Sequence, residues 1–175
     1  MAEDLTARLQ ALKLMAFDVD GVLTDGRLYY TDNGVETKTF HALDGQGMNM
    51  LRDAGFKLAL ITSRRSALVE RRARDLGIHY CYQGVAVKRD ALDEILAEQK
   101  LKPEQAGYMG DDLFDLGAMT RAGFAASVPA APAAVRQRAH YVTTRAGGEG
   151  AVREVCELIL QAQGALERLI AGYLK

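Results

Sequence analysis

FDVDGVLT, residues 17–24, begins at the end of a short apolar run and carries two aspartates, Asp18 and Asp20, one residue apart. The apolar run, residues 14–17, predicts a buried strand. Acidic side chains at the end of such a strand cost free energy unless a cation or hydrogen bonds compensate them. This stretch therefore predicts a strand whose carboxyl end binds a positively charged group.

Short apolar runs alternate with segments of helical periodicity along the rest of the chain. This alternation predicts an α/β fold, a Rossmann-like doubly wound parallel sheet with helices on both faces. The predicted strands are residues 14–17, 57–62, 78–82, 107–109, 124–128 and 140–143. The predicted helices are residues 47–54, 66–76, 89–99, 115–122, 133–138 and 151–160, and an apolar stripe continues to residue 173.

One segment, residues 27–40, interrupts the alternation after the first strand. Strand-forming residues lie on both sides of Asp32-Asn33-Gly34. Asn-Gly between such arms is a strong hairpin signal because both residues tolerate positive φ. We therefore expect a β-hairpin inserted in the first strand-to-helix connection.

Composition limits the class of protein. The 175 residues are 49% hydrophobic, which fits one domain over residues 1–175, and the net charge of −1 favours neither a nucleic acid nor a membrane as partner. The N-terminus, residues 1–14, has acids inside it and lacks the apolar core of a signal peptide, so we expect a cytoplasmic protein. Cys81 and Cys156 lie in separate apolar periodic segments and are expected to be reduced core residues.

Polar residues follow successive predicted strands at their carboxyl ends, where open α/β sheets bind ligands. Converging acids there favour Mg²⁺, and a hydroxyl and a lysine suit a phosphoryl group. Each feature alone has an ordinary explanation, such as a helix N-cap for an Asp-Asp pair. Their joint order indicates a magnesium and phosphate site, formed by Asp18, Asp20, Thr62, Lys88, Asp111 and Asp112.

The ordered motifs DVDGVLTDG, ITSR, YQGVAVK and GDDLFD resemble those of the haloacid dehalogenase superfamily. The resemblance is closer to its 3-deoxy-D-manno-octulosonate 8-phosphate phosphatase family, which has a similar YQG before its lysine. That family also has a C-terminal GGxGAVREVCELIL, matched here by residues 147–160. The resemblance covers roughly residues 12–163.

The resemblance implies a role for each motif residue. Asp18 would be the nucleophile that forms an aspartyl-phosphate, and Asp20 the general acid and then the general base. Mg²⁺ would bind the Asp18 carboxylate, the Asp20 backbone carbonyl and Asp111. Thr62 would bind phosphoryl oxygens and Lys88 would balance their charge. Asp112 or Asp115 would orient the lysine or the metal's waters.

The resemblance also implies a substrate and the residues that hold it. The expected substrate is 3-deoxy-D-manno-octulosonate 8-phosphate, a lipopolysaccharide precursor. The expected contacts are Asp20, His41, Asp44, Gly45, Ser63, Arg64, Arg72, Lys88 and Asp115. The family commonly has glycine where this chain has Ser63, and arginine where it has Leu43 and Asn49. We therefore expect this chain to bind the substrate less tightly.

Length and family point to an assembly. Residues 25–57 and 63–87 leave no room for the cap domain that larger superfamily members insert between these motifs. The family resembled is a homotetramer, and the resemblance implies that the glycine-rich segment 146–150 reaches a neighbouring site.

Three alternatives remain at this point. A phosphatase for another acidic sugar phosphate, such as a nonulosonate 9-phosphate, would have the same motifs. A phosphoacceptor receiver domain also carries a phosphorylated aspartate, but its adjacent acid pair follows the first strand, whereas here that pair follows the fourth. The receiver would also not need the second acid, Asp20. The third alternative is a non-catalytic structural or regulatory subunit, although every core catalytic residue is present in this chain.

Overall fold

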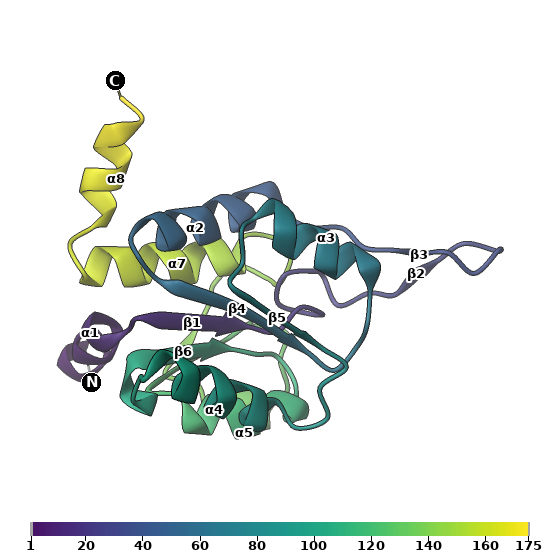
Figure 1. Cartoon of the computed structure of the whole chain (residues 1–175), viewed down its shortest axis with the longest axis horizontal. Helices are drawn as coiled ribbons and strands as arrows, with labels where there is room; N and C mark the ends of the chain where they lie inside the picture. Colours follow the sequence, from purple (N-terminus) through teal and green to yellow (C-terminus); the bar gives the residue numbers. More distant parts are fainter. Residues whose placement is uncertain (1, 175) are drawn as a thin grey trace.

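The computed structural model describes residues 2–174 and is built on one parallel sheet of six strands, in the order β5-β4-β1-β6-β7-β8 (Figure 1). The strands are β1 Leu14–Phe17, β4 Lys57–Thr62, β5 Tyr80–Gln83, β6 Ala106–Met109, β7 Phe124–Ser127 and β8 Tyr141–Val142. The β1 strand lies in the middle and all four of its residues are buried. The predicted doubly wound sheet is confirmed.

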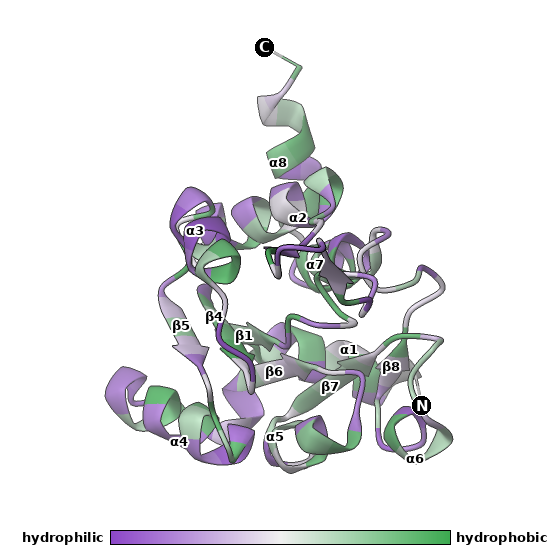
Figure 2. Ribbon diagram, turned by 90° about the vertical axis from the view of Figure 1, so that its right-hand side faces the viewer, coloured by the Kyte–Doolittle hydropathy of each residue, from purple (hydrophilic) through white to green (hydrophobic). Residues whose placement is uncertain are grey.

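Helices cover both faces of this sheet (Figure 2). One face carries α2 Ala42–Asp53, α3 Ala67–Asp75 and α7 Ala151–Ala162, and the other carries α4 Lys88–Gln99, α5 Leu116–Arg121 and α6 Ala133–Arg136. Two short 3-10 helices, η1 Pro103–Gln105 and η2 Leu113–Asp115, flank β6. The last helix, α8 Leu166–Gly172, points away from the body of the molecule.

Two helical features differ from the prediction. The first helix, α1 Ala2–Ala11, was not predicted, and it lies near the amino end of β1 (Figure 1). In addition, α2 begins at Ala42 rather than at residue 47. Glycines disfavour a helix by local propensity, but here they permit close packing, since a Cβ at Gly47 would lie 3.1 Å from the Cα of Arg153 on α7.

The predicted hairpin is present as β2 Tyr29–Tyr30 and β3 Glu36–Thr37, which pair antiparallel and extend outward (Figure 1). Its two strands are shorter than the segment 27–40 over which the hairpin was predicted. Of the Asn33-Gly34 pair only Gly34 adopts a positive φ, +80°, so the turn is not one with both residues left-handed.

The prediction for the cysteines is half right. Both are free, and Cys156 is buried on α7, but Cys81 is exposed. The reason is the position of β5 at the edge of the sheet. Within residues 2–174, none of the helices has the length and apolarity needed to cross a membrane.

Candidate active site

The strand order brings the predicted site residues to one edge of the sheet. Asp18 follows β1, Thr62 ends β4, Lys88 begins α4 and Asp111 follows β6. These residues share a cavity of about 290 Å³, whose lining is Asp18, Asp20, Gly26, Thr62, Ser63, Arg64, Lys88, Asp111, Asp112, Phe114 and Asp115. Residues far apart in the sequence thus form one concave site.

Lys88 is a buried ammonium that joins two carboxylates. Its Nζ lies 2.8 Å from Asp18 Oδ1 and 2.7 Å from Asp115 Oδ1. Burial alone lowers the pKa of Lys88, but the charges of Asp18 and Asp115 outweigh burial and raise it. The lysine therefore stays protonated and fixes the position of the Asp18 carboxylate.

Asp115 holds the lysine in place, and the Asp115 carboxylate is itself fixed by three other hydrogen bonds. Oδ1 also accepts from the Tyr108 hydroxyl at 2.8 Å, and Oδ2 accepts from the backbone amides of Asp111 at 2.9 Å and Asp112 at 3.0 Å. Sequence reasoning did not identify Tyr108. A polar aromatic residue in the strand just before the GDD motif was the only signal for it.

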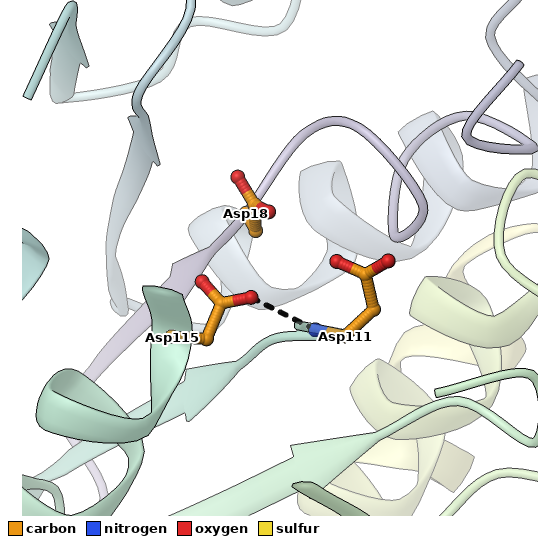
Figure 3. A group of neighbouring side chains, drawn as sticks. All are labelled: Asp18, Asp111 and Asp115. Atoms are coloured by element: carbon orange, nitrogen blue, oxygen red, sulfur yellow. Dashed lines mark hydrogen bonds between the residues drawn. The ribbon is translucent and has the colours of Figure 1, made fainter. Parts of the chain in front are cut away.

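The carboxylates of Asp18, Asp111 and Asp115 lie together, with one oxygen of each within 4.8 Å of the others (Figure 3). Asp111 Oδ1 is buried and has no hydrogen-bond partner. Burial, reinforced by the charge of Asp115, raises the pKa of Asp18 to about 8 and that of Asp111 to about 7. Such carboxylates need a cation to be ionised at neutral pH.

The donor set fits a hard divalent cation such as Mg²⁺. Since both Asp115 oxygens already have partners, Asp18 and Asp111 are the carboxylates free to bind it. The loop after β1 packs closely against Asp111, because a Cβ at Gly21 would lie 2.0 Å from Asp111 Oδ2. Gly21 has a φ of +87°, which also favours glycine.

Asp20 points elsewhere. Its Oδ1 pairs with the ammonium of Lys38 from the hairpin, and its Oδ2 lies 3.8 Å from Nε of Arg64. Sequence reasoning missed Lys38, because nothing in the sequence relates the hairpin's register to Asp20. Thr62 is buried, and its hydroxyl accepts from the backbone amide of Arg64 at 3.2 Å.

Four of the predicted substrate contacts do not line this cavity. Asp44 accepts hydrogen bonds from the backbone amides of Gly150 at 3.3 Å and Arg153 at 2.8 Å, so it caps the start of α7. Arg72 lies over Phe40, with its Cζ 5.7 Å from the ring centroid. The other two, His41 and Gly45, lie beside Arg72 at the start of α2.

The two positions that depart from the family pattern also lie outside this cavity. Leu43 is exposed and lines a separate cavity with Arg145 and Arg153. The Asn49 side-chain oxygen accepts a hydrogen bond from Arg52 at 3.0 Å. Within one chain, neither position contributes to the walls of the site around Asp18.

The glycine-rich segment 146–150 contacts its own chain, and its reach to a neighbouring site stays a prediction. The amide of Gly148 donates to the carbonyl of Val22 at 3.0 Å. A Cβ at Gly147 would lie 1.8 Å from the carbonyl oxygen of Gly21. The segment therefore supports the loop that follows Asp18.

Comparisons with known proteins agree with this site. The family model of haloacid dehalogenase-like hydrolases matches residues 29–128. The 3-deoxy-D-manno-octulosonate 8-phosphate phosphatase KdsC of Yersinia pestis is 44% identical over 167 residues, which are 95% of this chain and 89% of the relative.

Solved structures extend the similarity to the whole fold. The Moraxella catarrhalis 3-deoxy-D-manno-octulosonate 8-phosphate phosphatase, in complex with magnesium, phosphate and KDO, is 44% identical with a TM-score of 0.96 over 99% of both chains. The cobalt-bound Haemophilus influenzae phosphatase is 39% identical with a TM-score of 0.91, over 96% of this chain and 99% of its own. The chain therefore belongs to the haloacid dehalogenase-like hydrolases, in the family of the 3-deoxy-D-manno-octulosonate 8-phosphate phosphatases.

Proposed function

We propose that this protein is a Mg²⁺-dependent phosphatase that hydrolyses 3-deoxy-D-manno-octulosonate 8-phosphate to the free sugar acid and inorganic phosphate. The observation that carries this proposal is the meeting of Asp18, Lys88 and the unpartnered buried oxygen of Asp111 in one open cavity. A relative with the same fold binds magnesium, phosphate and KDO together.

The first half of the reaction transfers the phosphoryl group to the protein. An Asp18 oxygen attacks phosphorus, the bond from phosphorus to the sugar oxygen breaks, and Asp20 gives its proton to that oxygen. Lys88, fixed by Asp115, keeps the attacking carboxylate in place and offsets the added negative charge. The free sugar acid then leaves the open cavity.

The second half returns the protein to its starting state. Asp20, now ionised, takes a proton from water, and the resulting hydroxide attacks phosphorus and releases the Asp18 carboxylate. Asp20 thus ends the cycle protonated, and phosphate is the second product. The hydroxyl of Thr62, which lines the cavity, is a donor for the phosphoryl oxygens.

The carboxylates of Asp18 and Asp111 would hold Mg²⁺, with the Asp20 backbone carbonyl as the third protein ligand implied by the family resemblance. The cation would allow an anionic nucleophile to approach an anionic phosphate. This role agrees with the raised pKa values of both carboxyl groups in its absence.

The substrate proposal is tested by phosphate release from a panel of phosphate esters. The panel contains 3-deoxy-D-manno-octulosonate 8-phosphate, a nonulosonate 9-phosphate and glucose 6-phosphate, each with Mg²⁺ and with EDTA. We expect the highest kcat/KM on the octulosonate ester and no turnover in EDTA. A higher kcat/KM on glucose 6-phosphate would refute the substrate assignment and leave only a phosphatase of the superfamily.

We also propose that the protein is a cytoplasmic homotetramer in which each subunit completes the active-site cavity of a neighbouring subunit. The support is the open cavity and the apolar residues exposed on the hairpin, Leu28, Tyr29, Tyr30 and Val35. An assembly would also give a role to His41, Arg72 and the neighbouring residues, which lie outside their own chain's cavity.

A further inference from the structure

We infer that Lys38 is a positioning residue that sets the direction of the Asp20 carboxylate. This inference rests on the proposed function, since it concerns the residue proposed as general acid and base. Lys38 follows β3 at the base of the hairpin, and its ammonium pairs with Asp20 Oδ1. The hairpin therefore has a contact inside the active site as well as an exposed tip.

The burial of Lys38 shows that this contact is built into the fold. Only 3% of its side chain is exposed, although lysine is normally a solvated residue. Burying an ammonium is unfavourable unless acceptors compensate the lost water. Asp20 is one acceptor, and Glu36 Oε1 lies 3.6 Å away on the same hairpin.

Arg64 closes the pairing into a ring of alternating charges. One of its nitrogens lies 2.8 Å from Glu36 Oε1, and its Nε lies 3.8 Å from Asp20 Oδ2. Asp20 and Glu36 thus share the same two basic side chains, Lys38 and Arg64. Arg64 is 41% exposed, so Lys38 is the buried and better fixed of the two cations that contact Asp20.

The ring separates Asp20 from the other acids of the site. The carboxylates of Asp18, Asp111 and Asp115 have oxygens within 4.8 Å of one another, and Asp20 is outside this group. A free carboxylate this close in sequence to Asp18 could instead turn toward a bound cation. Lys38 keeps the Asp20 carboxylate out of this group, while Asp20 still lines the cavity in which the leaving group would lie.

The test is how the Lys38→Met variant responds to the leaving group. A sugar alkoxide needs a proton to leave, whereas p-nitrophenolate does not. We expect kcat/KM for the sugar phosphate to fall by about 10- to 100-fold and that for p-nitrophenyl phosphate by less than about 3-fold. Because Asp20 also serves as general base, p-nitrophenol should appear in a burst followed by a slow steady state.

Three further variants separate positioning from simple stabilisation. Lys38→Arg should recover most of the sugar-phosphate activity, since it keeps a cation. Lys57→Met makes the same change at the opposite end of β4 and should leave all rates unchanged. In the Asp20→Asn background, Lys38→Met should cost nothing further, because the group through which it acts is already gone.

The outcomes are distinguishable. Equal losses on both substrates, or full additivity with Asp20→Asn, would overturn the inference and leave Lys38 a structural residue. A Lys38→Met variant whose kcat/KM equals that of the wild type on both substrates would overturn the inference as well. A wild-type protein that hydrolyses neither substrate with Mg²⁺ would refute the proposed function itself, and this inference with it.

Discussion

Asp18 is the residue on which the proposed chemistry depends, and its substitution is the simplest test at this scale. Asp18→Asn is nearly isosteric and keeps an oxygen near Lys88, so the fold should survive. Because an amide is a poor nucleophile, we expect kcat to fall by at least about 10⁴-fold. Asp32→Asn, on the exposed turn of the hairpin, is the control and should retain full activity.

That assignment would fail if Asp18→Asn kept activity within about tenfold of the wild type. Thermal unfolding of both variants, measured beside the kinetics, distinguishes a lost nucleophile from a lost fold.

The raised pKa of Asp111 leads to a second prediction, which concerns the stability of the protein in the absence of metal. Its folded pKa of about 7 lies above the ordinary value of 3.8, because burial and then the charge of Asp115 disfavour ionisation. Between these two pH values the unfolded chain binds fewer protons than the folded one, so stability falls as pH rises. We therefore expect Tm in EDTA to decrease from pH 5 to pH 8, and Mg²⁺ to restore it.

Asp111→Asn removes this ionisation and checks the cause. In EDTA at pH 8 the variant should unfold at a higher temperature than the wild type. Its free energy of unfolding should be higher by on the order of 2 to 4 kcal/mol. It should also lose stabilisation by Mg²⁺. A wild type whose Tm in EDTA is flat or rises over this pH range would contradict the sign.

At the scale of elements, the segment before α7 supports the loop after β1. The contact is close, because a Cβ at Gly147 would lie 1.8 Å from the Gly21 carbonyl oxygen. Gly147→Ala should therefore displace the loop that carries Asp18, lowering stability by about 1 to 3 kcal/mol and activity by more than tenfold.

Gly172→Ala is the matched control, since a Cβ there meets nothing within 4 Å. Kinetics and thermal unfolding of the two variants should be compared under the same conditions. Equal behaviour of the two would show that the Gly147 contact relaxes without effect on the site.

The sheet could be predicted from sequence because its signals are local. Apolar runs such as residues 57–62 become strands with the same bounds, and the motif residues follow them at the carboxyl ends. The N-terminal helix depends on packing against the fold, where its Leu9 is buried. The start of α2 was missed because two glycines disfavour a helix locally, while their close packing is visible only in three dimensions.

The same limit applies to the site. Asp18, Thr62, Lys88 and Asp111 could be placed together because strand order alone brings them to one edge. The bond from Tyr108 to Asp115 and the reach of Lys38 across to Asp20 depend on side-chain direction. The capping of α7 by Asp44 likewise depends on packing that the sequence does not show, and its expected substrate contact stays a prediction.

At the scale of the whole molecule, the exposed hairpin predicts an assembly. Val35 is 55% exposed and isolated hairpins are marginally stable in water, so we expect subunits to bury this surface together. Val35→Asp should dissociate a homotetramer in light scattering while leaving the fold of each chain intact. Leu174→Asp, at the far end on an 82% exposed residue, is the control and should not alter the mass.

A wild-type protein that is monomeric and fully active at nanomolar concentration would refute the assembly. Deleting the whole hairpin would be a poorer test, because it would also remove Lys38 from Asp20 and so abolish activity for a local reason.

The central claim is that phosphoryl transfer passes through Asp18, and trapping the intermediate tests it most directly. The protein is mixed with Mg²⁺ and 3-deoxy-D-manno-octulosonate 8-phosphate and quenched during turnover with borohydride, which reduces an aspartyl-phosphate to homoserine. Peptide mass spectrometry then locates the reduced residue. The account predicts homoserine at position 18 alone, and only when both Mg²⁺ and substrate are present. Homoserine at another aspartate, or none during rapid turnover, would contradict it.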